Sequence, residues 1–457
     1  MLRTAILSLF LFASFVLAAP PADLSKSLVA DRVTDYIRIF NSGDETALRK
    51  WIEDNYTDSV LAIRPAEQRL NAFRQLKQDM EQIELHSVLA IDPEQTTVLI
   101  HTAHDEWFKL GFLHQSRPPH DLMGLRVDPT EAPALMENLP PLREKTALDS
   151  TRKMLDKLAK ADEFSGVVLV AKNGKPIFRK AYGFADRANE VPNDLDTKFN
   201  IGSINKTFTK IAIAQLIANN LLRADEKVGD LLPDYPNKEV RSKVTVQQLL
   251  DHQSGVPDFF GPEFARAAKD RLRSLADYLP FFAEKELEFK PGSREQYSNG
   301  GYIILGLIIE KISGQNYYDY VRENIFNRAG MEHSDWSMAD EIAPARAIGY
   351  THRWNYSPQD SEELRSNELV QPARGSSAGG GYSTADDLLR FVNAVQSGEL
   401  NSPEGANFGI AGGSPGVNAA VESGVGNGYI VIVLCNWDPP SAERAAGKIR
   451  RWLARVK

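Results

Sequence analysis

A proline-rich stretch early in the chain determines which parts can fold independently. Four prolines lie between Asp128 and Leu142, namely Pro129, Pro133, Pro140 and Pro141. Proline lacks a backbone N–H and pushes the residue before it out of the helical region, so this stretch favours neither a helix nor a strand. We therefore expect a linker over residues 129–143, a smaller domain over 25–128 and a larger domain over 144–457.

The first residues have the pattern of a secretory signal peptide. Arg3 precedes an apolar run from Ala5 to Ala19, which is shorter than the roughly 20 residues of a membrane-spanning helix. Small residues at its end favour cleavage after Ala18 or Ala19. We expect residues 1–19 to be removed and the mature chain, with no further transmembrane segment, to be secreted or periplasmic. An uncleaved membrane anchor is the alternative.

Composition limits the partners that the chain can have. Of the 457 residues, 42% are hydrophobic and 25% charged, which is ordinary for a globular protein large enough for two domains. The net charge is -8 and no block of Lys or Arg gathers in one segment, so nucleic acid is not an expected partner. The single cysteine, Cys435, excludes an internal disulfide and is interpreted as a small core residue.

The smaller domain has helical patterns first and strand patterns afterwards. Val33, Tyr36 and Phe40 repeat at the spacing of one helix face, and Gly43 marks the end of that helix. Strand-like runs follow over residues 83–91, 97–102, 106–113 and 122–127. This order predicts a small α+β domain. It resembles the cone-shaped nuclear-transport-factor-like domains that bacteria fuse ahead of enzymes.

Four histidines of the smaller domain suggest a metal site as one interpretation: His101, His104, His114 and His120. His101 and His104 are three residues apart in an expected strand, so their side chains point to opposite faces of a sheet. We therefore expect no metal and no cofactor.

The two ends of the larger domain both have strand patterns. Asn173 and Gly174 separate two apolar runs near its start, which predicts a hairpin over residues 166–182. A second strand pair is expected over residues 417–434, before a final helix that carries Ile449. We expect these strands to share one sheet, with the middle of the domain inserted between them.

Ser203 and Lys206 form the first pair of residues that indicates chemistry. They are three apart at the start of an apolar helical run, so one helical turn places them on the same face. A serine hydroxyl needs a base within hydrogen-bond reach to act as a nucleophile. Tyr297 and Asn299 stand in a later polar loop, where an ammonium would make the phenol more acidic and the amide would hold Lys206 or a substrate carbonyl.

Spacing alone does not identify this site, because both patterns occur twice. Ser150 and Lys153 repeat Ser-x-x-Lys and are interpreted as a solvated helix face. Tyr235 and Asn237 repeat Tyr-x-Asn around a proline, which is interpreted as a surface turn.

Further motifs separate the pair at Ser203 from its copies. Between residues 147 and 457 the chain contains, in order, Ser203-x-x-Lys206, LLDHQSG at 249–255, Tyr297-Ser-Asn299, GGGYSTADD at 379–387 and GGSPG at 412–416. This series resembles the serine β-lactamase and DD-peptidase superfamily, and within it the esterase-like branch related to class C β-lactamases. The resemblance implies an α+β fold: an antiparallel sheet flanked by helices, with an inserted helical subdomain.

The resemblance also implies a role for each site residue. Ser203 would form the acyl-enzyme, Lys206 and Tyr297 would share its proton, and Asn299 would orient them. Backbone N–H groups of Ser203 and Gly413 would hold the oxyanion. The implied substrate is a small ester, an amide or a peptide, and no cofactor is needed.

Two features depart from the family's pattern. Ile410 stands where the third motif usually begins with His or Lys, which weakens the expectation of a carboxylate-bearing substrate such as a β-lactam. Residues 391–408 are also several tens of residues shorter than usual. His252 is interpreted as scaffold. We expect a serine hydrolase; the alternative is a catalytically impaired penicillin-binding, ligand-binding or regulatory protein that keeps the fold.

Overall fold

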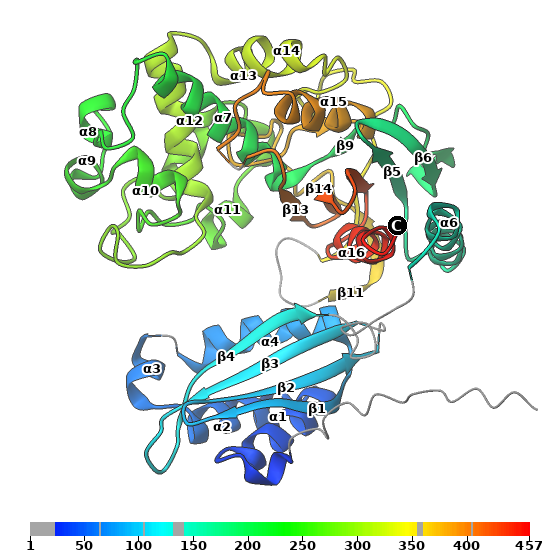
Figure 1. Ribbon diagram of the computed structural model, residues 1–457. Helices are drawn as coiled ribbons and strands as arrows, with labels where there is room; N and C mark the ends of the chain where they lie inside the picture. Colours follow the sequence, from blue (N-terminus) through cyan, green and yellow to red (C-terminus); the bar gives the residue numbers. More distant parts are fainter. Residues whose placement is uncertain (1–22, 64, 104–105, 131–140, 354–359, 404) are drawn as a thin grey trace, which may run out of the picture. The chain divides into compact units, whose positions relative to one another are not determined.

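The computed structural model describes residues 23–63, 65–103, 106–130, 141–353, 360–403 and 405–457 (Figure 1). The chain divides into two compact units, Met1–Leu139 and Pro140–Lys457. Helices and antiparallel sheets make up both, which confirms the predicted α+β class. Among the residues described, no helix is long and apolar enough to cross a membrane. The predicted signal peptide lies outside these residues.

In the first unit, helices precede a four-stranded antiparallel sheet of order β1-β2-β3-β4. Val33, Tyr36 and Phe40 of the first long helix are buried, as their spacing predicts, and Gly43 ends it in the left-handed conformation, with φ 69°. The elements are η1 (Leu24–Lys26), α1 (Ala30–Ser42), α2 (Glu45–Asn55), α3 (Asp58–Ile63), α4 (Ala66–Met80), β1 (Ile83–Asp92), β2 (Gln95–Thr102), β3 (Trp107–His114) and β4 (Leu122–Thr130).

Pro129 does not break regular structure as expected. It lies within β4, opposite Phe108 of β3. Because β4 is an edge strand, a residue without an N–H is tolerated on its open side. The sheet therefore continues to Thr130, inside the segment expected to be a linker, and the next described helix begins at Glu144.

The second unit is built on one five-stranded antiparallel sheet of order β13-β14-β15-β5-β6. Strands from the two ends of the domain therefore pair directly, β15 with β5, as predicted. The hairpin turn is at Asn173 and Gly174, whose φ values of 49° and 75° suit a tight turn. The strands are β5 (Gly166–Lys172), β6 (Lys175–Tyr182), β13 (Gly409–Ser414), β14 (Val417–Val425) and β15 (Tyr429–Cys435).

Both faces of this sheet are covered. Val168 and Val170 pack into a cluster with residues of α6 (Glu144–Lys160) and α16 (Ser441–Leu453), whereas Val167 and Leu169 pack into the main core on the other face. Successive side chains of a strand point to opposite faces, so a strand covered on both sides is apolar throughout. This explains the unbroken apolar runs that predicted the central strands.

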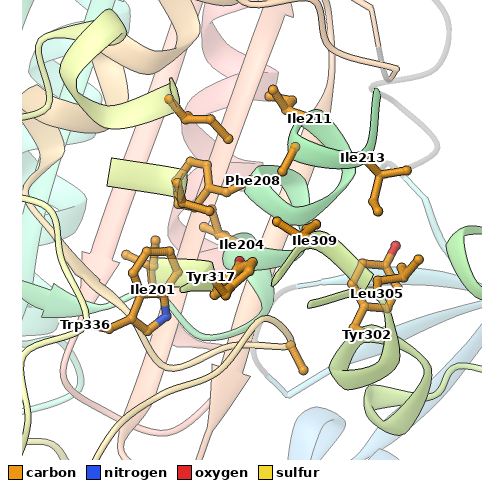
Figure 2. Packing of buried hydrophobic residues seen from close by; sticks show 14 of the residues in the cluster. Ile201, Ile204, Phe208, Ile211, Ile213, Tyr302, Leu305, Ile309, Tyr317 and Trp336 are labelled. Carbon is orange, nitrogen blue, oxygen red and sulfur yellow. The ribbon is translucent and has the colours of Figure 1, made fainter. Parts of the chain in front are cut away.

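Between the two groups of strands lies the predicted helical insertion. In Figure 2, Ile204, just before α7, and Phe208 of α7 lie near Ile309 of α12, and all three belong to one buried cluster. The inserted elements are β7 (Phe184–Asp186), β8 (Val191–Pro192), β9 (Phe199–Asn200), η2 (Gly202–Ile204), α7 (Asn205–Ala218), α8 (Val228–Leu231), α9 (Lys238–Lys243), α10 (Val246–Leu250), α11 (Pro262–Arg266), η3 (Lys269–Arg271), η4 (Leu275–Phe281), α12 (Asn299–Ser313), α13 (Tyr317–Val321), η5 (Arg322–Phe326), α14 (Asn327–Ala329), β10 (Tyr350–Arg353), β11 (Asp360–Ser366), β12 (Tyr382–Ser383) and α15 (Ala385–Gln396).

Candidate active site

Ser203 lies in η2, the short helical turn that leads into α7. The residue before it, Gly202, has a φ of 50°, and a Cβ on Gly202 would come within 2.8 Å of the Gly413 backbone nitrogen. Only glycine fits this combination of positive φ and close backbone approach. The local backbone therefore fixes Ser203 against the edge strand β13.

Lys206 follows one turn later and is buried beside Ser203. Its Nζ donates to Ser203 Oγ at 3.1 Å, to Asn299 Oδ1 at 2.7 Å and to the backbone carbonyl of Ala378. The side chain is only 5% exposed, and this desolvation lowers the pKa of Lys206 to about 7, although the charge of Asp258 raises it. Near neutral pH, a large fraction of this amine is therefore unprotonated.

Tyr297 and Asn299 are brought to the site by the start of α12. Ser298 caps this helix by accepting the Gly301 N–H at 3.0 Å, so that Tyr297 precedes the cap and Asn299 is the first helical residue. The Tyr297 hydroxyl donates to Ser203 Oγ at 2.8 Å. Ser203 is thus within hydrogen-bond reach of both an amine and a phenol, and Asn299 reaches the amine from α12.

The Tyr297 phenol is less acidic than the sequence led us to expect. Desolvation raises its pKa to about 12, Asp258 adds to this rise, and the hydrogen bond with Ser203 only partly opposes it. An ammonium would have lowered the value, but Lys206 itself is largely neutral at pH values above 7. In this geometry Tyr297 is a protonated hydrogen-bond donor at neutral pH.

Two residues that sequence reasoning did not place in the site support it. Asp258 Oδ2 accepts from the backbone N–H and the Nδ2 of Asn299, at 3.0 and 2.8 Å. These bonds turn the Asn299 carbonyl oxygen toward Lys206. His252, interpreted as scaffold, stacks on the Tyr297 ring at 4.5 Å and accepts the Ser298 N–H at 3.2 Å. Burial lowers the pKa of His252 to about 4, so it is neutral there.

The edge strand β13 presents its backbone to Ser203. A two-residue turn at 415–416 joins β13 to β14, so the residues that flank it, Ser414 and Val417, form a hydrogen-bonded pair. Such pairs alternate along an antiparallel ladder, so Gly413 and Asn418 form a pair without backbone hydrogen bonds between them. The Gly413 N–H consequently points away from β14, toward the free edge. A Cβ on Gly412 would lie 2.6 Å from the Ser203 nitrogen, so the two backbones are in contact.

Ile410 lies on the same strand and packs, partly buried, against the main core. It places no charged or hydrogen-bonding side chain at the start of this motif. The shortened segment after Phe391 contains the end of α15 and leads into β13, which pairs at the edge of the sheet.

A pocket of about 250 Å³ opens at Ser203. Tyr297, Asn299 and Gly413 line it near the serine, and Phe259, Phe260 and Tyr278 give it an apolar wall. Convergent polar groups in a mostly apolar pocket are typical of a site for a small organic molecule.

The repeated motifs lie elsewhere. Lys153 is exposed on α6, as interpreted. The interpretation of Tyr235 as part of a surface turn was wrong, because its side chain is 5% exposed and packs in the main core, while Asn237 caps α9. Cys435 is buried, and burial raises the pKa of its thiol to about 12. Within the described parts of the chain, no group of three His, Cys, Asp or Glu is placed to hold a metal; His104 lies outside them.

Comparison with known proteins supports the resemblance to the serine β-lactamase and DD-peptidase superfamily. A family model described as Beta-lactamase matches residues 151–429. Penicillin-binding protein 4* of Bacillus subtilis (strain 168) is 29% identical over 257 residues, 54% of this chain and 56% of that protein. The chain thus spans about half the length of the curated relatives it matches.

Solved structures extend the likeness to the fold. A penicillin binding protein from Bacillus halodurans is 31% identical with a TM-score of 0.56, covering 65% of this chain and 97% of that chain. A D-amino acid amidase from Ochrobactrum anthropi SV3 has a TM-score of 0.56 at 22% identity, covering 68% of this chain and 98% of that chain, and shows likeness of fold alone. The nuclear-transport-factor-like resemblance of the first unit stays a prediction.

The matched stretch takes up more than half of the chain and contains Ser203, Lys206, Tyr297, Asn299 and Gly413. The motif series that suggested the resemblance therefore coincides with the family match and with the residues gathered around the pocket. The chain belongs to the Beta-lactamase family, the superfamily of serine β-lactamases and penicillin-binding proteins.

Proposed function

We propose that this chain is a serine hydrolase that cleaves a small ester or amide through an acyl-enzyme on Ser203. The observation that carries the proposal is the position of Ser203 Oγ, 3.1 Å from the buried Lys206 amine and 2.8 Å from the Tyr297 hydroxyl. A hydroxyl flanked by a neutral amine and a phenol has both a base to take its proton and a donor to return one.

In the proposed first step, Lys206 accepts the Ser203 proton while Oγ forms a bond to the substrate carbonyl carbon. The carbonyl oxygen gains the negative charge, which the N–H groups of Ser203 and Gly413 stabilise as an oxyanion hole. When the bond to the leaving group breaks, Tyr297 donates its proton to the leaving oxygen or nitrogen and takes one back from the Lys206 ammonium. The ester with Ser203 remains.

In the second step, water replaces the leaving group. One of its protons passes to Lys206 directly or through Tyr297 while its oxygen attacks the acyl carbon. The bond from that carbon to Ser203 Oγ then breaks, and Oγ takes the proton back from the Lys206 ammonium, which restores the serine hydroxyl and releases the acid. Asn299 holds the amine in place throughout, because Asp258 fixes its amide from the other side.

The substrate class follows from what surrounds the serine. Relatives of this fold are named as penicillin-binding proteins and as a D-amino acid amidase, so esters, amides and peptides are the candidates. Ile410 offers no charge at the start of the third motif, which disfavours a leaving group with a carboxylate there. A binding or regulatory protein that keeps the fold is the competing function, and the same departure at Ile410 is the observation that favours it.

Intact-mass spectrometry tests the proposal. The mature protein is exposed separately to a fluorophosphonate and to a penicillin, with Ser203→Ala as the control. We expect a stable adduct with the fluorophosphonate that is absent from Ser203→Ala. A folded protein that forms no adduct with either reagent contradicts the hydrolase proposal and supports the binding alternative; an adduct with penicillin that never turns over identifies a penicillin-binding protein.

The pH dependence of the reaction reports on the base. Because the pKa of Lys206 is lowered to about 7, the neutral amine is lost as the pH falls below that value. For a neutral 4-nitrophenyl ester, log(kcat/KM) is expected to rise by about one per pH unit below pH 7 and to level off above it. Activity that rises as the pH falls through 7 contradicts this assignment.

Asp258→Asn tests the role of the Lys206 amine, because the substitution removes a carboxylate charge that acts on it. Asp258 raises the pKa of Lys206, so removal of its charge is expected to shift the rising limb to lower pH. The amide oxygen of the new side chain still accepts from Asn299, so the plateau should change little. Asp251→Asn, a change at a nearby exposed carboxylate, is the control and should leave the profile in place.

A further inference from the structure

Two charged residues on the pocket wall, Arg346 and Glu368, indicate a second feature for substrate recognition. The wall includes Gly413 and Ser414 of β13 but not Ile410, so the pocket extends past the Ser414 end of the strand. Arg346 and Glu368 line the pocket with Ser203 and Gly413. Ile410 stands where the family usually has a cationic residue, at the start of the third motif. Arg346 brings a cation to the pocket from a different part of the chain.

Arg346 is held in place by uncharged partners. Its backbone bridges to Lys198, next to β9. Its guanidinium donates to the carbonyl oxygens of Met338 at 3.1 Å and Ala339 at 3.3 Å, and lies 5.4 Å from the centre of the Tyr382 ring. A guanidinium has five N–H groups, so three remain for a ligand. Among the described residues Arg346 has no carboxylate partner.

Glu368 supplies an opposing charge on the same wall. Its exposed carboxylate makes no hydrogen bond or ion pair within the described chain, and it follows Asn367, whose buried amide is bonded to the Pro415 carbonyl at 2.9 Å. Burial raises the pKa of the Tyr382 phenol; Arg346 opposes this rise and Glu368 adds to it. The charges of Arg346 and Glu368 therefore both act on the Tyr382 phenol, which belongs to a residue that lines the pocket.

We propose that Arg346 binds a carboxylate carried by the acyl part of the substrate. Tyr297, which protonates the leaving group, is half-exposed, so we place that group toward solvent and the acyl part in the pocket that Gly413 and Arg346 line. A fixed guanidinium with unused N–H groups is suited to a carboxylate, which it binds by charge-assisted hydrogen bonds. This inference rests on the proposed Ser203 chemistry and names its substrate class: esters or amides of acids with a distal carboxylate.

The test compares two esters of equal chain length. Mono-4-nitrophenyl adipate carries a terminal carboxylate and 4-nitrophenyl hexanoate does not. The wild-type protein is expected to prefer the adipate, and Arg346→Gln to lower kcat/KM for the adipate by about 10- to 100-fold, the size of a hydrogen bond to a charged group. The hexanoate corrects for any disturbance of the loop at Met338. Glu368→Gln should act oppositely, raising the adipate value by up to about fivefold.

The outcomes separate this inference from the proposed function. If Arg346→Gln slows both esters equally, or if the wild-type protein shows no preference for the adipate, Arg346 does not bind the carboxylate. If neither ester is hydrolysed, or if hydrolysis survives in Ser203→Ala, the hydrolase proposal itself fails. Retention of the preference in Arg346→Lys but not in Arg346→Gln supports recognition by charge.

Discussion

Lys206→Met is expected to lower kcat/KM for a neutral ester by about 10²- to 10⁴-fold, the usual contribution of a positioned general base. Methionine has nearly the length of lysine and tolerates an apolar site, so the buried space is filled. The amine that accepts the Ser203 proton is lost, and Tyr297, with its pKa raised to about 12, cannot replace it at neutral pH. The Asn299 carbonyl also loses its donor.

The chain contains its own control for this substitution. Lys153 stands in a second Ser-x-x-Lys spacing but is exposed on α6. Lys153→Met should therefore leave kcat/KM within twofold of the wild-type value, and circular dichroism and thermal melting should show both variants folded. A folded Lys206→Met protein with wild-type acylation would remove Lys206 from the mechanism.

The fold of the second unit was predictable because its strands are covered on both faces and its turns have distinctive residues. Asn173 and Gly174 identified one hairpin, and the apolar run that ends near Leu434 identified a strand of the same sheet. Pro129 was misjudged because a local rule on proline does not show that β4 is an edge strand. Tyr235 was misjudged because a turn sequence does not show whether its aromatic residue points inward.

The site was predictable only where chemistry is encoded by spacing. Ser203 and Lys206 share a helical turn, and their motif series indicated the partners Tyr297, just before α12, and Asn299, its first residue. Asp258 and Arg346 carried no such signal, since each is a single charged residue in a loop, and only the fold brings them to Asn299 and to the pocket. The pKa of Tyr297 was also beyond sequence reasoning, because it depends on burial.

Gly412→Ala is the prediction that tests the backbone contact between β13 and Ser203. A Cβ at this position would lie 2.2 Å from the Ile201 carbonyl oxygen and 2.6 Å from the Ser203 nitrogen. Both are backbone atoms, so no side chain can rotate away, and the edge strand must move from the serine. Since Gly413 moves with it, one proposed oxyanion donor is displaced, and kcat is expected to fall by about 10²- to 10³-fold.

Gly409→Ala on the same strand is the matched control, because the added Cβ would meet only the carboxylate of Glu422, at 3.0 Å, which is the movable end of a side chain. Its activity should stay near that of the wild-type protein. The fluorophosphonate adduct adds a second readout, since its phosphoryl oxygen needs the same N–H donors, and Gly412→Ala should label more slowly although Ser203 and Lys206 are intact. If Gly412→Ala and Gly409→Ala are equally active, the Gly413 N–H does not stabilise the oxyanion, and the donor must come from elsewhere around Ser203.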